Sequence, residues 1–458
     1  MLPVSLHFGL EGVVSTVLYV GMWATFLLSL AWKPQLGVYV LAFMLPLQTV
    51  RYRLHDMFLG AQFVDLLLLG VVLGLAIKRQ KIIPKTPLTK FLLLLCVFYY
   101  FSLWEGSFFI DVPPPIWITD PRFSDWKNYV EMFIIALIVA SAIREEKHVR
   151  TLLLVMSLSV LILNRNYISL LSGLDLTHFT YESREEGLLG YAGVNGLGAF
   201  EAMVFSVLLA AYAYARQMWL KVAIGILAAT SMYCLLFSFS RGGYVAALVG
   251  LVTVGFLKNR KFLVIAAVIF LAWQALLPTS VQERIRMTTE TDGAGPLDSS
   301  AGERLVLWED AMNLFMRNPI TGTGFETYRY MYRIERFRDT HNYFVKVLAE
   351  TGIVGITLFL ILLWKLIRLG LSLFVRGQTP LWSGLGLGFV ALMFSLMVAN
   401  CFGDRWTYQQ VDGYLWILLG CVMTGLRITD ELQKNKVLEK ADDMEVSSSF
   451  EPVLEPQR

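Results

Sequence analysis

The chain has 458 residues, of which 56% are hydrophobic and only 16% are charged, and its mean hydropathy is +0.57. This composition excludes a water-soluble globular domain, and the length excludes a single membrane anchor, so the sequence predicts a bundle of many spans. The net charge of +3, with no basic tail, argues against a nucleic-acid partner.

Apolar runs close to the about 20 residues that cross a bilayer recur from Val13 to Leu426. They lie at residues 13–32, 36–50, 63–77, 91–104, 129–143, 151–171, 191–215, 219–239, 244–257, 262–277, 343–369, 381–399 and 411–426. The run at 36–50 is short and Pro34 interrupts its approach, so both twelve and thirteen spans are compatible with the pattern. We expect an all-α integral membrane protein, with a first span that is not cleaved as a signal peptide.

Basic loops indicate how the spans are oriented. The loops at 78–81, 144–150 and 258–261 are short and rich in Lys and Arg, which is typical of the cytoplasmic side. Alternation then places 105–128, 172–190, 240–243, 278–341 and 403–406 outside. The expected organisation is N-terminal spans in 1–277, a periplasmic helical loop in 278–341, C-terminal spans in 342–427, and a disordered cytoplasmic tail in 428–458.

The outer loop at 278–341 is the only long hydrophilic stretch between spans, and its pattern predicts two amphipathic helices, at 303–317 and 325–337. Its cations are arginines at positions 284, 286, 304, 317, 329, 333, 336 and 338, without a single lysine. The planar guanidinium suits bidentate contacts with phosphate. The loop therefore indicates a phosphate-bearing ligand, although local Glu and Asp residues must pair with some of these arginines.

Three groups of residues are candidates for a site. Arg241 lies in SRGG (240–243), where glycines let a ligand approach the backbone, although an arginine in a tight turn at the interface can also simply snorkel. Arg304 and Trp308 are spaced to share one helical face, which an amphipathic anchor would explain almost as well. His341 opens a span where the arginine-rich loop returns to the membrane, so it is a candidate catalytic residue, although a lone histidine is usually structural.

Several signatures of other chemistries are absent from the sequence. Cys96, Cys234, Cys401 and Cys421 show no CxxC spacing, which argues against a zinc site or a disulfide framework. There is no DxD pair, no GxxxxGK[ST] loop and no HExxH. No metal and no cofactor is therefore expected.

In ordered blocks, the sequence resembles the O-antigen ligase and O-antigen polymerase superfamily. The blocks are REEGLLGYAGVNGLGAF (184–200), SRGG, GERLVLWEDAMNLFMRNPITGTGFETY (302–328), HNYFVKVLAETGIVG (341–355) and GDRW (403–406). The N-terminal spans match only in general hydropathy.

The resemblance implies a metal-independent, multi-pass glycosyltransferase of the bacterial inner membrane, with its active site facing the periplasm. Its donor would be an undecaprenyl diphosphate-linked glycan. By position, Arg241 and Arg304 match the arginines thought to hold the diphosphate, His341 matches the histidine thought to activate the acceptor hydroxyl, and Arg184 is a weaker candidate for the same anion site. Thr340 stands where family members carry a second histidine, which puts any role shared by two histidines in doubt.

The acceptor is not encoded in these blocks. Lipid A-core oligosaccharide, giving O-antigen ligation in lipopolysaccharide assembly, is expected slightly ahead of other glycan acceptors. The alternatives are an O-antigen or exopolysaccharide repeat-unit polymerase, a protein O-oligosaccharyltransferase, and a lipid-linked glycan flippase. In-line attack by a hydroxyl predicts inversion at the anomeric carbon, and membrane lipids are expected partners in every case.

Overall fold

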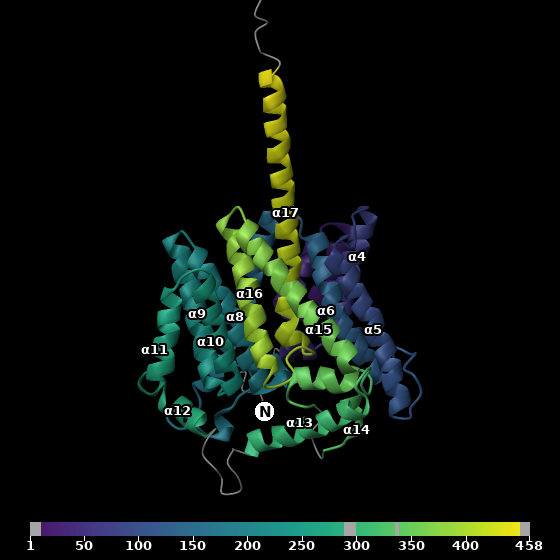
Figure 1. Cartoon of the computed structure of the whole chain (residues 1–458), viewed down its shortest axis with the longest axis vertical. Coiled ribbons are helices and arrows are strands. Elements are labelled where there is room, and N and C mark those ends of the chain that lie inside the picture. Colours follow the sequence, from purple (N-terminus) through teal and green to yellow (C-terminus); the bar gives the residue numbers. More distant parts are fainter. Residues whose placement is uncertain (1–10, 288–298, 335–338, 449–458) are drawn as a thin grey trace, which may run out of the picture.

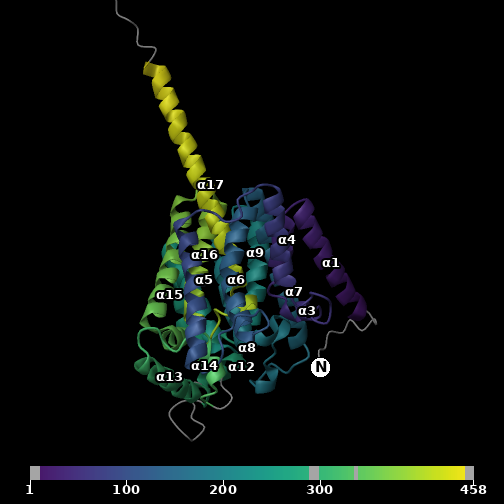
Figure 2. The same ribbon diagram turned by 90° about the vertical axis from the view of Figure 1, so that its right-hand side faces the viewer.

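The computed structural model describes residues 11–287, 299–334 and 339–448, and every regular element in these residues is a helix. Upright helices form a bundle (Figures 1 and 2), with short or tilted helices across one end and a long helix projecting from the other. The predicted all-α membrane fold is confirmed. The thirteen apolar runs expected to span all lie largely within helices.

The first half of the bundle contains α1 (Glu11–Ala31), α2 (Gln35–Met44), α3 (Gln48–Tyr52), α4 (Phe63–Ile77), α5 (Pro87–Phe109), α6 (Pro121–Ala142), α7 (Glu146–Leu171), η1 (Tyr181–Ser183), η2 (Gly187–Ala192) and α8 (Gly193–Tyr214). The second half contains α9 (Met218–Phe237), α10 (Arg241–Leu257), α11 (Lys261–Leu276), α12 (Thr279–Arg286), α13 (Ser299–Arg317), α14 (Thr327–Met331), α15 (Tyr343–Arg376), α16 (Pro380–Asn400) and α17 (Gln409–Ser448).

Among the described residues, eight helices are long and apolar enough to cross a membrane, or nine if the bent pair α11 and α12 is one span. The shorter apolar helices are α2, α4 and α10. Helix α6 stands upright among the spans (Figure 1), although Asp125, Lys127 and Glu131 interrupt its apolar sequence. The difference from twelve or thirteen spans therefore reflects short or charged helices.

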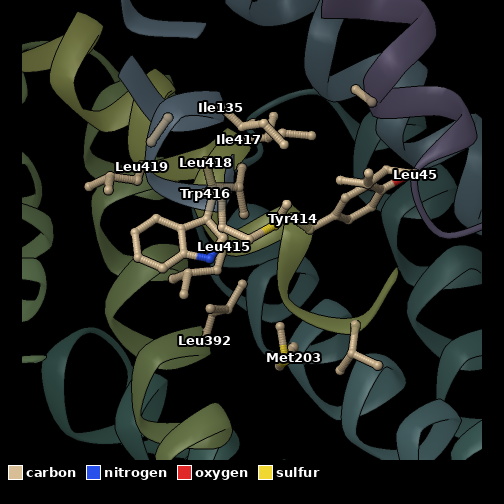
Figure 3. Close-up of a cluster of buried hydrophobic side chains, with 14 of the residues drawn as sticks. Leu45, Ile135, Met203, Leu392, Tyr414, Leu415, Trp416, Ile417, Leu418 and Leu419 are labelled. Atoms are coloured by element: carbon tan, nitrogen blue, oxygen red, sulfur yellow. The ribbon is translucent and has the colours of Figure 1, made fainter. Parts of the chain in front are cut away.

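Helix α17 runs through the middle of the bundle. Figure 3 shows its Trp416, Ile417 and Leu418 among side chains of neighbouring helices, including Ile135 of α6 and Leu392 of α16. All five side chains are at most 2% exposed. The last span is therefore a core element. The residues just before it, which include GDRW (403–406), are held by its packing in the bundle.

The C-terminal tail differs from the expectation. The sequence predicts disorder from residue 428, but α17 continues as a helix to Ser448, and only 449–458 lie outside the described residues. Residues 428–448 contain no Gly or Pro and are rich in Glu, Leu and Lys, which favour helix. The buried span has already formed the first turns, so extending it avoids the cost of nucleation. The polar composition of this segment alone therefore did not predict its conformation.

The loop between α11 and α15 is a helical cap, as predicted, but its second helix is much shorter than expected. Helix α13 contains the predicted 303–317 segment, whereas the segment predicted at 325–337 forms only the five residues of α14. Glu326 and Tyr332 on either side of α14 have left-handed backbones (φ 60° and 50°), which end the helix at both sides. Residues 335–337 lie outside the described residues.

The cap is fastened to the bundle by backbone contacts. Phe325 N donates to the Ser102 carbonyl of α5 at 3.1 Å, and Thr323 N donates to the Ala349 carbonyl of α15 at 3.1 Å. Helix α15 is broken at Gly352, whose φ of 59° lies in the left-handed region. A Cβ at this position would clash with the Ile320 carbonyl oxygen of the cap.

Replacing Gly352 by alanine is expected to lower the thermal unfolding midpoint in detergent. The left-handed backbone alone costs a non-glycine residue about 1–3 kcal/mol, and the clash with Ile320 adds to this. Gly21→Ala is the matched control, because a Cβ on Gly21 of α1 would meet no atom within 4 Å. An equal midpoint for both variants would contradict this account of the cap.

Candidate functional site

The sequence blocks singled out above meet at the end of the bundle that carries the cap. Helix α10 begins in SRGG, where the Ser240 hydroxyl accepts a hydrogen bond from Gly243 N at 3.4 Å. A Cβ on Gly243 would lie 2.9 Å from the Gly198 carbonyl carbon, and one on Gly242 would lie 2.9 Å from Phe402 Cβ. The glycines therefore let the SRGG turn pack against both the GVNGLG segment of α8 and the turn that contains GDRW.

Arg241 is the first residue of α10 and half-buried in this junction. Immediately before it, Phe239 has a left-handed backbone (φ 52°), and its carbonyl accepts a hydrogen bond from Arg284 Nε at 3.3 Å. Arg284 belongs to α12 and is only 5% exposed. Its guanidinium lies over the Phe179 ring, with Cζ 4.9 Å from the centroid. Arg284 of the cap therefore lies buried beside the start of α10.

Arg184 lies beside Arg284. Its Nη2 donates to Asn195 Oδ1 of the GVNGLG segment at 3.0 Å. Burial, and then the positive charge of Arg284, lowers the pKa of the Arg184 guanidinium to about 10. These two cations, one buried and one half-buried, make this part of the site positively charged. From sequence, Arg284 was one loop arginine among eight, and nothing in the chain singled it out.

His341 is held at the start of α15. The Asn342 side chain caps this helix, accepting hydrogen bonds from Phe344 N at 3.0 Å and Val345 N at 3.3 Å. His341 itself has a left-handed backbone (φ 50°), and its Nδ1 lies 3.0 Å from Asp339 Oδ1. A carboxylate on Nδ1 fixes the tautomer that leaves the lone pair on Nε2. Asp339 was not predicted, although its position two residues before the histidine was a usable signal.

Burial alone would raise the pKa of Asp339, but the hydrogen bonds and charge of His341 outweigh it and hold this pKa at about 2. Because the folded-state pKa lies below the ordinary value of about 4, ionised Asp339 stabilises the fold above that value. This contribution is lost only as the pH falls toward 2. The carboxylate therefore stays charged throughout any physiological range.

If His341 has the role of base that the sequence predicts, replacing Asp339 by asparagine is expected to lower the reaction rate by about 10-fold to 100-fold at neutral pH. The loss should be smaller than that for removing the base itself, because Asp339 only orients the ring. The test is the pH profile of kcat. An acidic limb that shifts in Asp339→Asn supports a positioning role, whereas an unchanged kcat and profile would contradict it.

The helix α13 of the cap reaches the same place. Trp308 Nε1 donates to the Thr340 carbonyl at 2.9 Å, directly beside His341. Leu307, Ala311 and Leu314 pack α13 onto α15, and Arg304 lies one turn before Trp308 on its helix. The buried Thr340 donates its hydroxyl proton to the Asn342 carbonyl at 2.7 Å, so this position serves the turn.

A buried ion-pair network joins three of the blocks. Lys346 of α15 is 5% exposed, and its Nζ lies 2.7 Å from Glu326 Oε1 of the cap and 3.1 Å from Asp404 Oδ2 of GDRW. Glu350, one turn further along α15, accepts hydrogen bonds from Glu326 N and Tyr328 N at 3.1 and 3.0 Å. The network fixes the cap and the GDRW turn relative to the helix that carries His341. Sequence reasoning did not single out Lys346.

Arg405, also in GDRW, completes the connection to His341. It is 9% exposed, and Asn400 Oδ1 accepts a hydrogen bond from its backbone N at 2.9 Å. Burial lowers the pKa of Arg405, while Tyr408, Asp339 and Asp404 act in the opposite direction. The arginine thus lies within electrostatic reach of the carboxylate that holds His341.

The structure therefore places the four predicted residues in one continuous region. Arg184 lies near Arg284, which donates to the Phe239 carbonyl two residues before Arg241, and the SRGG turn packs against Phe402. Arg405 lies within electrostatic reach of Asp339, and Trp308, one turn after Arg304, donates to the carbonyl beside His341. In the described ranges, no group of three or more His, Cys, Asp or Glu residues is placed to hold a metal ion. What the region offers to a ligand is several cations and a carboxylate-bound histidine.

Comparison with known proteins gives one family. Residues 226–360 match the family model described as O-Antigen ligase. This segment runs from α9 to the first half of α15, so it includes Arg241, Arg304 and His341 but neither Arg184 nor GDRW. No curated protein matches the chain.

Proposed function

We propose that this chain transfers a glycan from undecaprenyl diphosphate to a hydroxyl acceptor. The match of residues 226–360 to the O-antigen ligase family supports a membrane glycosyltransferase of the ligase or polymerase type. The acceptor that we propose is lipid A-core oligosaccharide, in lipopolysaccharide assembly. The observation that carries the proposal is the contact of His341 Nδ1 with Asp339 at 3.0 Å, in a region lined by buried arginines.

In the proposed reaction, His341 acts as the general base. Its Nε2 accepts the proton of the acceptor hydroxyl as that oxygen attacks the anomeric carbon, and the bond from this carbon to the diphosphate oxygen breaks. The electron pair leaves with the lipid diphosphate, and the proton stays on the imidazolium, which Asp339 stabilises. A single displacement of this kind inverts the anomeric configuration.

The leaving diphosphate is assigned to the arginines. Arg241 begins α10, Arg284 donates to the Phe239 carbonyl just before it, Arg184 lies beside Arg284, and Arg304 belongs to α13 of the cap. Each charge-assisted hydrogen bond to a phosphate oxygen contributes about 1.5–3 kcal/mol. Fixed cations that meet a developing negative charge need no metal ion to lower the barrier, so we propose a metal-independent reaction.

We further propose that the cap faces the periplasm of the bacterial inner membrane. The basic loops at 78–81, 144–150 and 258–261 all lie at the other end, which supports a cytoplasmic location for that end. Single cysteines at the exposed Ile320 and Arg260, in a chain without accessible native cysteines, would test this in intact cells. An impermeant thiol reagent should label only the cysteine at 320, and labelling only at 260 would remove the proposal.

The experiment that tests the function is glycan transfer by the purified protein from a lipid diphosphate-linked glycan, with chelator present. Lipid A-core and a second lipid-linked repeat compete as acceptors, with a serine-containing peptide as a third. Product on lipid A-core supports the ligase, whereas product on the second repeat or on the peptide would reassign the chain to a polymerase or to a protein O-oligosaccharyltransferase. Without product, translocation of the intact lipid-linked glycan in vesicles would indicate a flippase and overturn the proposal.

A further inference from the structure

A second charged region lies at the opposite end of the bundle from His341. It is a cavity of about 1150 Å³ between the α4–α5 loop, the end of α6, α15 and α17. Eight Lys and Arg side chains line it, against only two carboxylates, Asp430 and Glu431. The proposed transfer reaction uses none of them.

The carboxylates do not neutralise this charge. Arg376 pairs with Asp430, but no other lining cation forms an ion pair in the part of the chain that the structure describes. Two arginines are instead tied to backbone carbonyls. Arg144 Nε donates to Ser141 O at 2.8 Å, and Arg427 Nη2 donates to Arg144 O at 3.1 Å. The cations are therefore oriented by the fold while most of their charge is left for a ligand.

A bias of basic residues toward one side of the membrane does not explain the whole cavity. That bias concerns loops, whereas Lys365 and Arg368 lie within α15. Arg368 is eight residues before the helix end at Arg376, which corresponds to about 12 Å along the helix. These two side chains therefore belong to the helical wall of the cavity rather than to a loop.

The walls of the cavity are amphipathic. Leu88, Leu369, Met423 and Leu426 line it together with Trp364, which is 56% exposed. Arg368 Cζ lies 5.5 Å and Lys365 Nζ 5.9 Å from the Trp364 ring centroid. A free anion would not use these apolar walls. A phosphate group attached to acyl chains would place its charge among the cations and its chains along the leucines and the tryptophan.

We propose that this cavity binds the phosphate head group of one anionic phospholipid of the surrounding leaflet. Lys365 and Arg368 would contact the phosphate from α15, Arg144 from the loop after α6, and Arg427 from α17. The bound lipid would join these elements at the end of the bundle remote from the cap. Lipid binding at this cavity requires neither the transferase reaction nor a particular acceptor.

The test is lipid binding by the purified protein, measured by native mass spectrometry during titration with phosphatidylglycerol, phosphatidylcholine or inorganic phosphate. The wild type should retain phosphatidylglycerol in preference to phosphatidylcholine. The double variant Lys365→Gln/Arg368→Gln should bind phosphatidylglycerol on the order of tenfold or more weakly, because each basic residue contributes substantially near an anionic lipid. Inorganic phosphate should compete poorly.

The matched control is Arg260→Gln/Lys261→Gln, which removes the same charge from the same end but does not line the cavity. It should bind phosphatidylglycerol like the wild type. Equal weakening by both double variants, equal retention of both lipids, or complete displacement by inorganic phosphate would each overturn the proposal. Glycan transfer measured in the same preparations reports on the proposed function. A failure of lipid binding can therefore be distinguished from a failure of the proposed transferase activity.

Discussion

Replacing His341 by alanine is expected to lower the rate of glycan transfer by about 10²–10⁴-fold, the usual contribution of a positioned general base. The loss should appear in kcat rather than in KM for the lipid-linked donor, because the arginines that are assigned to the diphosphate remain. Initial rates at several donor concentrations measure both constants. The Asn342 cap keeps the start of α15 in place without the imidazole, so the variant is expected to fold.

The chain provides a close control for this variant. His178 also carries a carboxylate on Nδ1, with Glu283 Oε1 at 2.7 Å, but its side chain is 73% exposed and the proposed reaction assigns it no role. His178→Ala should therefore retain wild-type kcat. If His341→Ala kept its rate, or if both variants lost activity to the same extent, His341 would not be the base.

The bundle was predictable because its physics is local. A run of about 20 apolar residues with few charges has to become a helix in a membrane, and the positions of Lys and Arg separate the two ends. The predicted helix boundaries were wrong where contacts with distant segments outweighed the preference of the local sequence. Residues 428–448 are polar, yet they continue a helix that is already nucleated in the core. Helix α14 is short because Glu326, just before it, turns into the buried network and Tyr332, just after it, has a left-handed backbone.

The site was predictable only in part, for the same reason. Arg241, Arg304 and His341 stand out because each lies in a distinctive short motif. Their partners do not, since their importance comes from the proximity of distant segments: Arg284 donates to the Phe239 carbonyl, and Arg405 lies within electrostatic reach of Asp339. One sequence contains no information on such pairs. Asp339 is the exception, because it lies within two residues of the histidine that it orients.

The glycines of SRGG show how the sequence motif and the packing of the bundle are connected. In the sequence, the two glycines of SRGG indicate only that a ligand could approach the backbone. In the structure, Gly243 permits the contact with Gly198 of α8, and Gly242 permits the contact with Phe402. The motif is therefore a packing junction that holds Arg241 in place. This explains why an arginine motif and a glycine motif occur together.

Replacing Lys346 by methionine is expected to be among the most destabilising single substitutions at this end of the bundle. It would leave Glu326 and Asp404 as buried charges without their cation, and removing one partner of a buried ion pair costs about 3–5 kcal/mol. The thermal unfolding midpoint in detergent should fall clearly. Lys261→Met, at the exposed start of α11, should leave it unchanged.

A double-mutant cycle separates the network from a general intolerance of substitutions. Glu326→Gln removes one of the two stranded charges, while the hydrogen bonds from Trp406 N and Thr407 N to Asp404 Oδ1, both 3.1 Å, remain. The double variant Lys346→Met/Glu326→Gln should therefore unfold at a higher temperature than the sum of the single effects predicts. Strict additivity would mean that Lys346 and Glu326 are not coupled, and the ion-pair network would then not be what holds the cap, GDRW and His341 together.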